Sequence, residues 1–118
     1  MNGADGCGGK LRPEVERFAW AMEMKLRKND HKGGWRDCDF DYLETRIREE
    51  LAELGMELMR YQIALHSADE VTLAQQLAEK VQLEAADVAN FAMMIADNAR
   101  REFVSWPEDV GLVAEAGK

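Results

Sequence analysis

Two acidic tracts, EELAE at residues 49–53 and EAAD at residues 84–87, decide how this chain folds and what it binds. Both tracts lie in sequence of strong helical character, and a helix places residues three apart on neighbouring positions of one face. Glu50 and Glu53 therefore project together, and the two acids of the second tract do the same. Which faces they occupy determines whether these acids are surface groups or a binding site.

The first tract interrupts an apolar stripe on its helix. The stripe has the 3.6-residue period of an α-helix and consists of Leu43, Ile47, Leu51, Leu54, Leu58 and Leu65. Glu50 lies three residues after Ile47 and four before Leu54, so it falls inside the stripe. Glu53 falls at the edge of the same stripe.

The second tract interrupts a second stripe in the same way. That stripe consists of Val81, Val88, Phe91 and Ile95, with Met94 beside it. Glu84 lies three residues after Val81 and four before Val88, and Asp87 lies four residues before Phe91. Two helices therefore carry acids where a core-facing helix ordinarily carries leucine.

Acids in such positions need a proton, a basic side chain or a metal ion to offset their burial. A buried carboxylate without one costs several kcal/mol, and in practice it is protonated, paired or bound to a metal. Most carboxylates on helices are solvated, but these interrupt apolar stripes with a shared three-residue step. An oxygen-only set suits a hard cation such as Mg²⁺, with Mn²⁺ as the second choice. The expected metal ligands are Glu50, Glu53, Glu84 and Asp87.

The composition fits one globular domain without a membrane span. The chain has 118 residues, of which 47% are apolar and 32% charged, and no apolar run approaches the roughly 20 residues of a transmembrane helix. The net charge of −8 argues against nucleic-acid binding, because phosphate contacts need Lys and Arg. We see no secretory signal and expect a cytoplasmic protein. Cys7 and Cys38 lack metal-ligand spacing and are interpreted as ordinary thiols.

The helical periodicity predicts an all-α fold, an antiparallel bundle of three main helices. We expect a flexible tail at residues 1–10, a single domain at 11–118, helices at about 13–28, 41–66 and 70–101, and a short helix after Trp106. Three helices leave apolar surface uncovered, so we expect oligomerisation to complete the bundle. Four methionines are candidates for that interface or, more simply, core fillers: Met56, Met59, Met93 and Met94.

The segment between the first two helices is rich in groups that bind small polar molecules. It contains His31, Lys32 and Trp35 beside a Gly-Gly pair that interrupts helix. Trp35 is either a core residue or a platform for stacking on a base. Lys25 and Lys28 are either a solvated face or phosphate contacts. Asn90, one turn beyond the second tract, needs a hydrogen-bond partner if it is buried, and it is a further candidate for substrate contact.

The two tracts resemble the paired motif of the MazG-like nucleoside triphosphate pyrophosphohydrolases, members of the all-α NTP pyrophosphatase superfamily. The resemblance covers residues 26–98 and is reinforced by further matches: Leu43-x-x-Arg46 before the first tract, DVANF at 87–91 and HKGGW at 31–35. One departure is the 30 residues between Glu53 and Glu84, slightly more than in the shorter members. Substrate choice is therefore not taken from any one branch of the family.

The resemblance implies Mg²⁺-dependent hydrolysis of an NTP or dNTP between the α- and β-phosphates, giving a monophosphate and pyrophosphate. It also implies a homodimer or homotetramer, with the four acids named above as Mg²⁺ ligands and Glu49 as the first acid of the motif. Glu49 and Glu53 are the candidates for orienting or deprotonating the attacking water. The expected substrate contacts are Lys25, Lys28, His31, Lys32, Trp35 and Asn90.

Two other functions remain open at this point. A di-iron or di-manganese carboxylate bundle would use Glu-x-x-His motifs, but neither His31 nor His66 has that spacing. A non-catalytic helical interaction module would need no acids inside an apolar stripe. Both alternatives predict the same helical architecture, so only the site can separate them.

Overall fold

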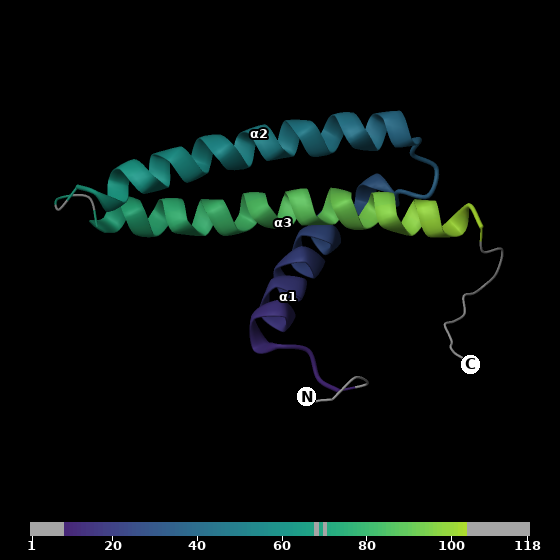
Figure 1. Cartoon of the computed structure of the whole chain (residues 1–118), viewed down its shortest axis with the longest axis horizontal. Helices are drawn as coiled ribbons and strands as arrows, with labels where there is room; N and C mark the ends of the chain where they lie inside the picture. Colours follow the sequence, from purple (N-terminus) through teal and green to yellow (C-terminus); the bar gives the residue numbers. More distant parts are fainter. Residues whose placement is uncertain (1–8, 68, 70, 104–118) are drawn as a thin grey trace.

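The computed structural model describes residues 9–103 except 68 and 70, and it is all-helical over that part of the chain (Figure 1). Its elements in order are α1 (Pro13–Lys28), the single-turn helix η1 (Asp30–Lys32), α2 (Phe40–Leu65) and α3 (Val71–Arg101). The expected all-α class with three packed helices is confirmed. The expected helix after Trp106 and most of the expected N-terminal tail lie outside the described residues.

Local chemistry explains the ends of α1. Pro13 stands in the first turn, where its missing N–H costs nothing, and Glu14 and Glu16 face the positive end of the helix dipole. The last turn carries Lys25 and Lys28, which suit the negative end. None of its residues is fully buried, and those partly buried, among them Met22 and Leu26, lie in its C-terminal half.

The start of α2 is fixed by a side-chain cap. Asp39 Oδ1 accepts a hydrogen bond from the backbone N–H of Tyr42 at 2.8 Å. A cap of this kind satisfies one of the amide groups left free at a helix N-terminus. Asp41 lies in the first turn, where its charge suits the positive end of the helix dipole.

The two long helices α2 and α3 form an antiparallel hairpin, and α1 crosses it with its C-terminal end against α3 (Figure 1). The buried apolar residues of the described chain are few and mostly small: Leu43, Ala64, Ala74, Leu77 and Ala86. Alanines allow two helix backbones to approach closely, but they bury little apolar area. The hairpin therefore holds its two helices together with a thin core.

Much apolar surface is left uncovered on this hairpin. Met56, Met59 and Ile63 are 51%, 57% and 66% exposed and follow the i, i+3, i+7 spacing of one helix face. Met93 and Met94 are partly buried on α3. The radius of gyration is 17.8 Å, against about 13.5 Å for a compact domain of this length.

No helix in residues 9–67 and 71–103 has both the length and the apolar character needed to cross a lipid bilayer.

Candidate metal centre

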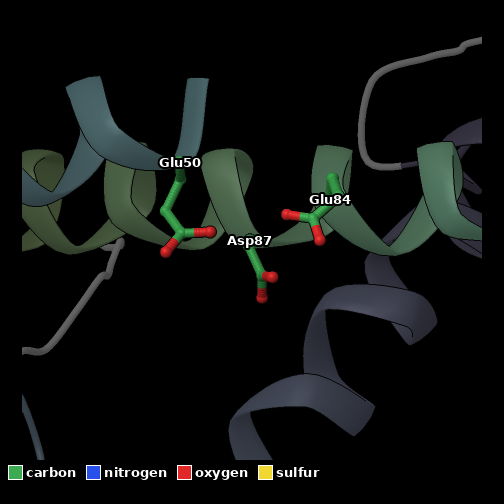
Figure 2. Close-up of side chains that lie close together, drawn as sticks. All are labelled: Glu50, Glu84 and Asp87. Carbon is green, nitrogen blue, oxygen red and sulfur yellow. The ribbon is translucent and has the colours of Figure 1, made fainter. Parts of the chain in front are cut away.

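Three carboxylates meet where the middle of α2 faces the middle of α3 (Figure 2). Glu50 of α2 and Glu84 and Asp87 of α3 each offer one oxygen, and these oxygens all lie within 4.8 Å of one another. The three-residue step in α3 puts its two acids on one face, and the hairpin brings Glu50 opposite them. We refer to these three residues as the acid cluster.

Burial and mutual repulsion act on this cluster together. Glu50 is 7% exposed, and burial raises its pKa, as do the charges of Glu53 and Asp87. Burial also raises the pKa of Glu84, and the charge of Asp87 is the next largest cause. Both groups therefore resist ionisation, which is the expected behaviour of like charges gathered in a poorly solvated place.

The donor atoms of the cluster fit a divalent cation. Glu84 Oε1 of the cluster is buried and has no hydrogen-bond partner among the described residues. The same is true of Asn90 Oδ1, which belongs to the neighbouring cleft lining and not to the cluster. The Asn90 amide nitrogen is already committed, donating to the backbone oxygen of Met22 at 3.1 Å, which leaves Oδ1 as the atom available to a ligand. Carboxylate and amide oxygens are the ligands that Mg²⁺ and Mn²⁺ prefer.

Two cations reach the acid cluster from its sides. Lys25 Nζ of α1 lies 3.2 Å from Asp87 Oδ2. Arg46 donates a hydrogen bond to Glu50 Oε2 at 2.8 Å and another to Glu49, and its guanidinium lies over the Phe91 ring at 5.1 Å. From the sequence, Arg46 was expected only as part of the Leu43-x-x-Arg46 motif. Its four-residue spacing from Glu50 was the signal for a direct contact.

A cleft of about 540 Å³ opens beside the acid cluster. Its lining combines acidic and basic side chains. The acids include Glu50 and Asp87, and the basic residues are Lys25, Lys32 and Arg46. Its other walls include Trp35, Asn90, Phe91 and the fully buried Leu43. Such a cleft can hold a ligand that combines anionic groups, a flat apolar part and a bound cation.

The structure places the sequence-predicted residues in three groups. Six are in the cleft lining: Glu50, Asp87, Lys25, Lys32, Trp35 and Asn90. Glu84 completes the acid cluster, and Glu53 is exposed yet near enough for its charge to raise the pKa of Glu50 and of Glu84. The remaining three are exposed and do not line the cleft: Glu49, Lys28 and His31.

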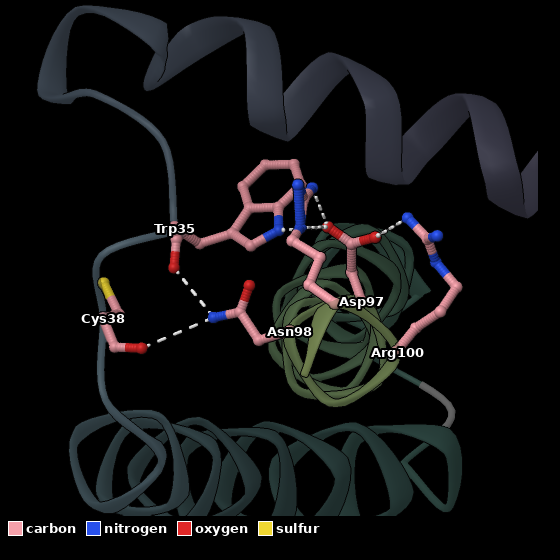
Figure 3. A network of polar contacts seen from close by, with 6 residues as sticks. Trp35, Cys38, Asp97, Asn98 and Arg100 are labelled. Carbon is pink, nitrogen blue, oxygen red and sulfur yellow. Dashed lines mark hydrogen bonds and ion pairs between the residues drawn. The ribbon is translucent and has the colours of Figure 1, made fainter. Parts of the chain in front are cut away.

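The loop that carries Trp35 is tied to the end of α3 (Figure 3). The indole N–H of Trp35 donates to Asp97 Oδ2 at 3.0 Å, and the Asn98 amide donates to the Trp35 carbonyl oxygen at 2.9 Å. Gly33, at the start of the loop, has a φ of 89°, which side chains rarely permit. Asp97 and Asn98 could not be identified from the sequence, because no periodic pattern links residues 62 or 63 positions apart.

Comparisons of the chain with protein-family models, curated proteins and solved structures gave no significant match.

The raised pKa of Glu84 predicts that its charge destabilises the fold. A carboxyl whose pKa is raised above 4.5 in the folded state loses stability as the pH rises through the interval from 4.5 to the folded value. Glu84→Gln is therefore expected to raise the melting temperature at pH 7, without added metal, by about a few degrees, the usual scale for one relieved interaction in a domain of this size. Thermal melts followed by circular dichroism measure the change.

The matched control is Glu79→Gln, which neutralises an exposed acid on the same helix. The two variants should differ at pH 7, and the advantage of Glu84→Gln should vanish below pH 4.5, where the native carboxyl is itself neutral. An equal effect of both substitutions would mean that only the net charge of the protein matters.

Proposed function

We propose that this protein hydrolyses a nucleoside or deoxynucleoside triphosphate at the α–β phosphate bond, giving the monophosphate and pyrophosphate in a Mg²⁺-dependent reaction in the cytoplasm. The observation that carries the proposal is the acid cluster of Glu50, Glu84 and Asp87, which lies beside a cleft also lined by three basic side chains. The resemblance to MazG-like enzymes supplies the reaction type, and the geometry is consistent with it.

Different residues of the cleft would bind the phosphates and the base of the nucleotide. Acids alone would repel a triphosphate, so the cations Lys25, Lys32 and Arg46 are needed to bind its oxygens. Mg²⁺ on the acid cluster would supply charge neutralisation and polarise the phosphate oxygens. The ring of Trp35 offers a flat surface for the base.

Glu53 is the better of the two candidates for orienting the attacking water. The residue is exposed, and its charge lies close enough to Glu50 and Glu84 to raise their pKa values. Glu49 is instead bonded to Arg46, which orients the guanidinium that holds Glu50. We therefore assign Glu53 to the water and Glu49 to the positioning of Arg46.

The ligand set of the acid cluster suits an iron centre less well than it suits Mg²⁺ or Mn²⁺. Its three residues are all carboxylates, and no histidine of the described chain belongs to it. His66 lies at the far end of α2 from the cluster, with Nδ1 2.7 Å from the backbone oxygen of Gln62. Di-iron bundles use histidine with carboxylate ligands, so an oxygen-only set favours Mg²⁺ or Mn²⁺.

A substrate panel tests the proposed reaction. The full chain is incubated with each of the common NTPs and dNTPs and Mg²⁺, with pyrophosphatase added and phosphate release measured. We expect release that requires Mg²⁺, requires the added pyrophosphatase, and disappears in Asp87→Asn. Phosphate release without pyrophosphatase would indicate cleavage at the γ-phosphate, and no release with any nucleotide would contradict the proposal.

We also propose that the protein is a homodimer or a homotetramer. The described chain buries only five apolar residues, three of them alanine, while Met56, Met59 and Ile63 line up on the outer face of α2. A second copy of the hairpin on this face would complete a four-helix bundle, in which apolar faces of long helices are normally buried.

The substitution Met59→Lys is expected to dissociate the oligomer, because it places a charge in the middle of that face. Sedimentation or light scattering measures the mass of the particle. The control is Lys80→Met, which removes an exposed charge from α3 and should leave the mass unchanged. An unaltered mass for Met59→Lys would show that this face is not the interface.

A further inference from the structure

Two consecutive residues near the end of α3 bind the loop that carries Trp35, one through the loop backbone and the other through the Trp35 side chain (Figure 3). Asn98 is 7% exposed and holds the backbone, donating to the carbonyl oxygens of Trp35 at 2.9 Å and of Cys38 at 3.4 Å. Asp97 holds the side chain, accepting the indole N–H of Trp35 at 3.0 Å. The path of the loop and the orientation of the indole therefore depend on separate residues.

The Asp97 carboxylate is itself fixed by two arginines. Arg101 Nε donates to Oδ2 at 3.1 Å, and Arg100 donates to Oδ1 at 3.2 Å. Burial raises the pKa of this carboxyl, but hydrogen bonds from Arg101, Trp35 and Arg100 lower it by more, so the group stays ionised. A hydrogen bond to an ionised acceptor is roughly twice as strong as one between neutral groups.

This bond determines what Trp35 can offer to a ligand. The indole has a single polar hydrogen, which Asp97 already accepts. Trp35 is only partly buried and lines the cleft that also contains Asn90 and Phe91. What remains for a ligand is the apolar ring, which recognises flat groups by stacking and not by hydrogen bonding.

We propose that Asp97 is a positioning residue that fixes the Trp35 ring as a stacking wall for a flat heteroaromatic group. Given the proposed function, that group is the base of the nucleotide. Asp97 acts through Trp35 and touches neither the phosphates nor the acid cluster, so it governs binding of the base and leaves the chemical step unchanged. Stacking on one ring tolerates different bases. The Trp35 ring held by Asp97 therefore favours nucleotides over inorganic polyphosphates but does not discriminate between bases.

The expected effects separate base binding from chemistry. Asp97→Ala frees the ring to rotate, and immobilising one side chain on binding costs affinity of about fivefold to tenfold. We therefore expect KM to rise by about that factor with kcat unchanged. Inhibition by the monophosphate product should weaken to the same extent, whereas inhibition by pyrophosphate, which has no base, should not change.

Three further variants distinguish positioning from general stability. Asp97→Asn retains an oxygen acceptor for the indole and should restore most of the affinity lost in Asp97→Ala. Trp35→Phe keeps a ring but removes the N–H, so adding Asp97→Ala to it should produce no further rise in KM. Glu102→Ala is the matched control, because it removes an exposed acid nearby and should change nothing.

A fluorescence readout makes the test independent of turnover. In a Trp20→Phe, Trp106→Phe background Trp35 is the only tryptophan left, and ATP or dCTP should quench it with an affinity that Asp97→Ala lowers. If no nucleotide is hydrolysed but quenching depends on Asp97, the proposed reaction fails while the positioning stands. If Asp97→Ala raises KM equally in the Trp35→Phe background, or if no nucleotide quenches Trp35, the positioning proposal is overturned.

Discussion

Replacing Asp87 by asparagine is expected to lower kcat by about a thousandfold while the chain stays folded. Asp87 contributes to the acid cluster and also lines the cleft. Metal-ion stabilisation of charge in a phosphoryl-transfer transition state contributes several kcal/mol, and each 1.36 kcal/mol is about a tenfold change in rate. Glu50→Gln should have a similar effect, because Glu50 supplies the cluster's oxygen from α2.

Two measurements show whether that loss arises at the metal. Steady-state kinetics over a range of Mg²⁺ concentration gives kcat, and thermal melts with and without Mg²⁺ give the binding linkage. At a Mg²⁺ concentration of 100 times Kd, wild-type protein should gain about 2.7 kcal/mol of stability, and Asp87→Asn should gain much less.

Asp41→Asn is the matched control, since it neutralises an exposed acid in the first turn of α2. It should retain both turnover and the Mg²⁺-dependent stabilisation. If Asp87→Asn or Glu50→Gln unfolds the protein instead, the acids are structural and the metal assignment is wrong.

The helices were predictable from the sequence because each is specified locally. Capping, charge at the helix ends and apolar period are properties of short segments, and the observed limits of the three helices lie within one residue of the expected ones. The acid cluster could also be predicted from the sequence, because Glu50 and Glu84 interrupt apolar stripes that can be recognised there. The stripe on α2 was only partly right as a core face, because Leu51, Leu58 and Leu65 are exposed, as Glu53 is.

The features that could not be predicted from the sequence all depend on contacts between distant segments. The angle at which α1 crosses the hairpin determines that Lys25 meets Asp87, and no periodicity within α1 encodes that angle. The bond between Trp35 and Asp97 joins a loop to a helix end 62 positions away. Trp35 could be proposed as a substrate contact from its residue type, but the residue that orients it required the structure.

The ion pair between Lys25 and Asp87 yields the second large effect. Lys25 Nζ lies 3.2 Å from Asp87 Oδ2, and both side chains are about three-quarters buried, with 25% and 23% exposed. A divalent cation on Asp87 competes with this ammonium group and is repelled by its charge. Lys25→Gln is therefore expected to bind Mg²⁺ about threefold to tenfold more tightly, since it removes a competing ion pair worth about 1 kcal/mol.

The same substitution should weaken substrate binding. Lys25 lines the cleft, and a charge-assisted hydrogen bond to a phosphate contributes about 1.5–3 kcal/mol, so KM for the triphosphate should rise by about tenfold or more. Calorimetric titration with Mg²⁺ alone and kinetics at saturating Mg²⁺ measure the two effects separately. Lys28→Gln removes a charge from the same helix but outside the cleft and should change neither quantity.

The opposite signs of the two effects make Lys25 a sharp test of the site. A lysine that is only a solvated surface group would leave both affinities unchanged, as expected for Lys28, because salt screens its charge. A lysine that only stabilises the packing of α1 on α3 would lower the melting temperature and weaken both ligands. Tighter Mg²⁺ binding together with weaker triphosphate binding requires one ammonium group that lies between the metal ligands and the phosphates.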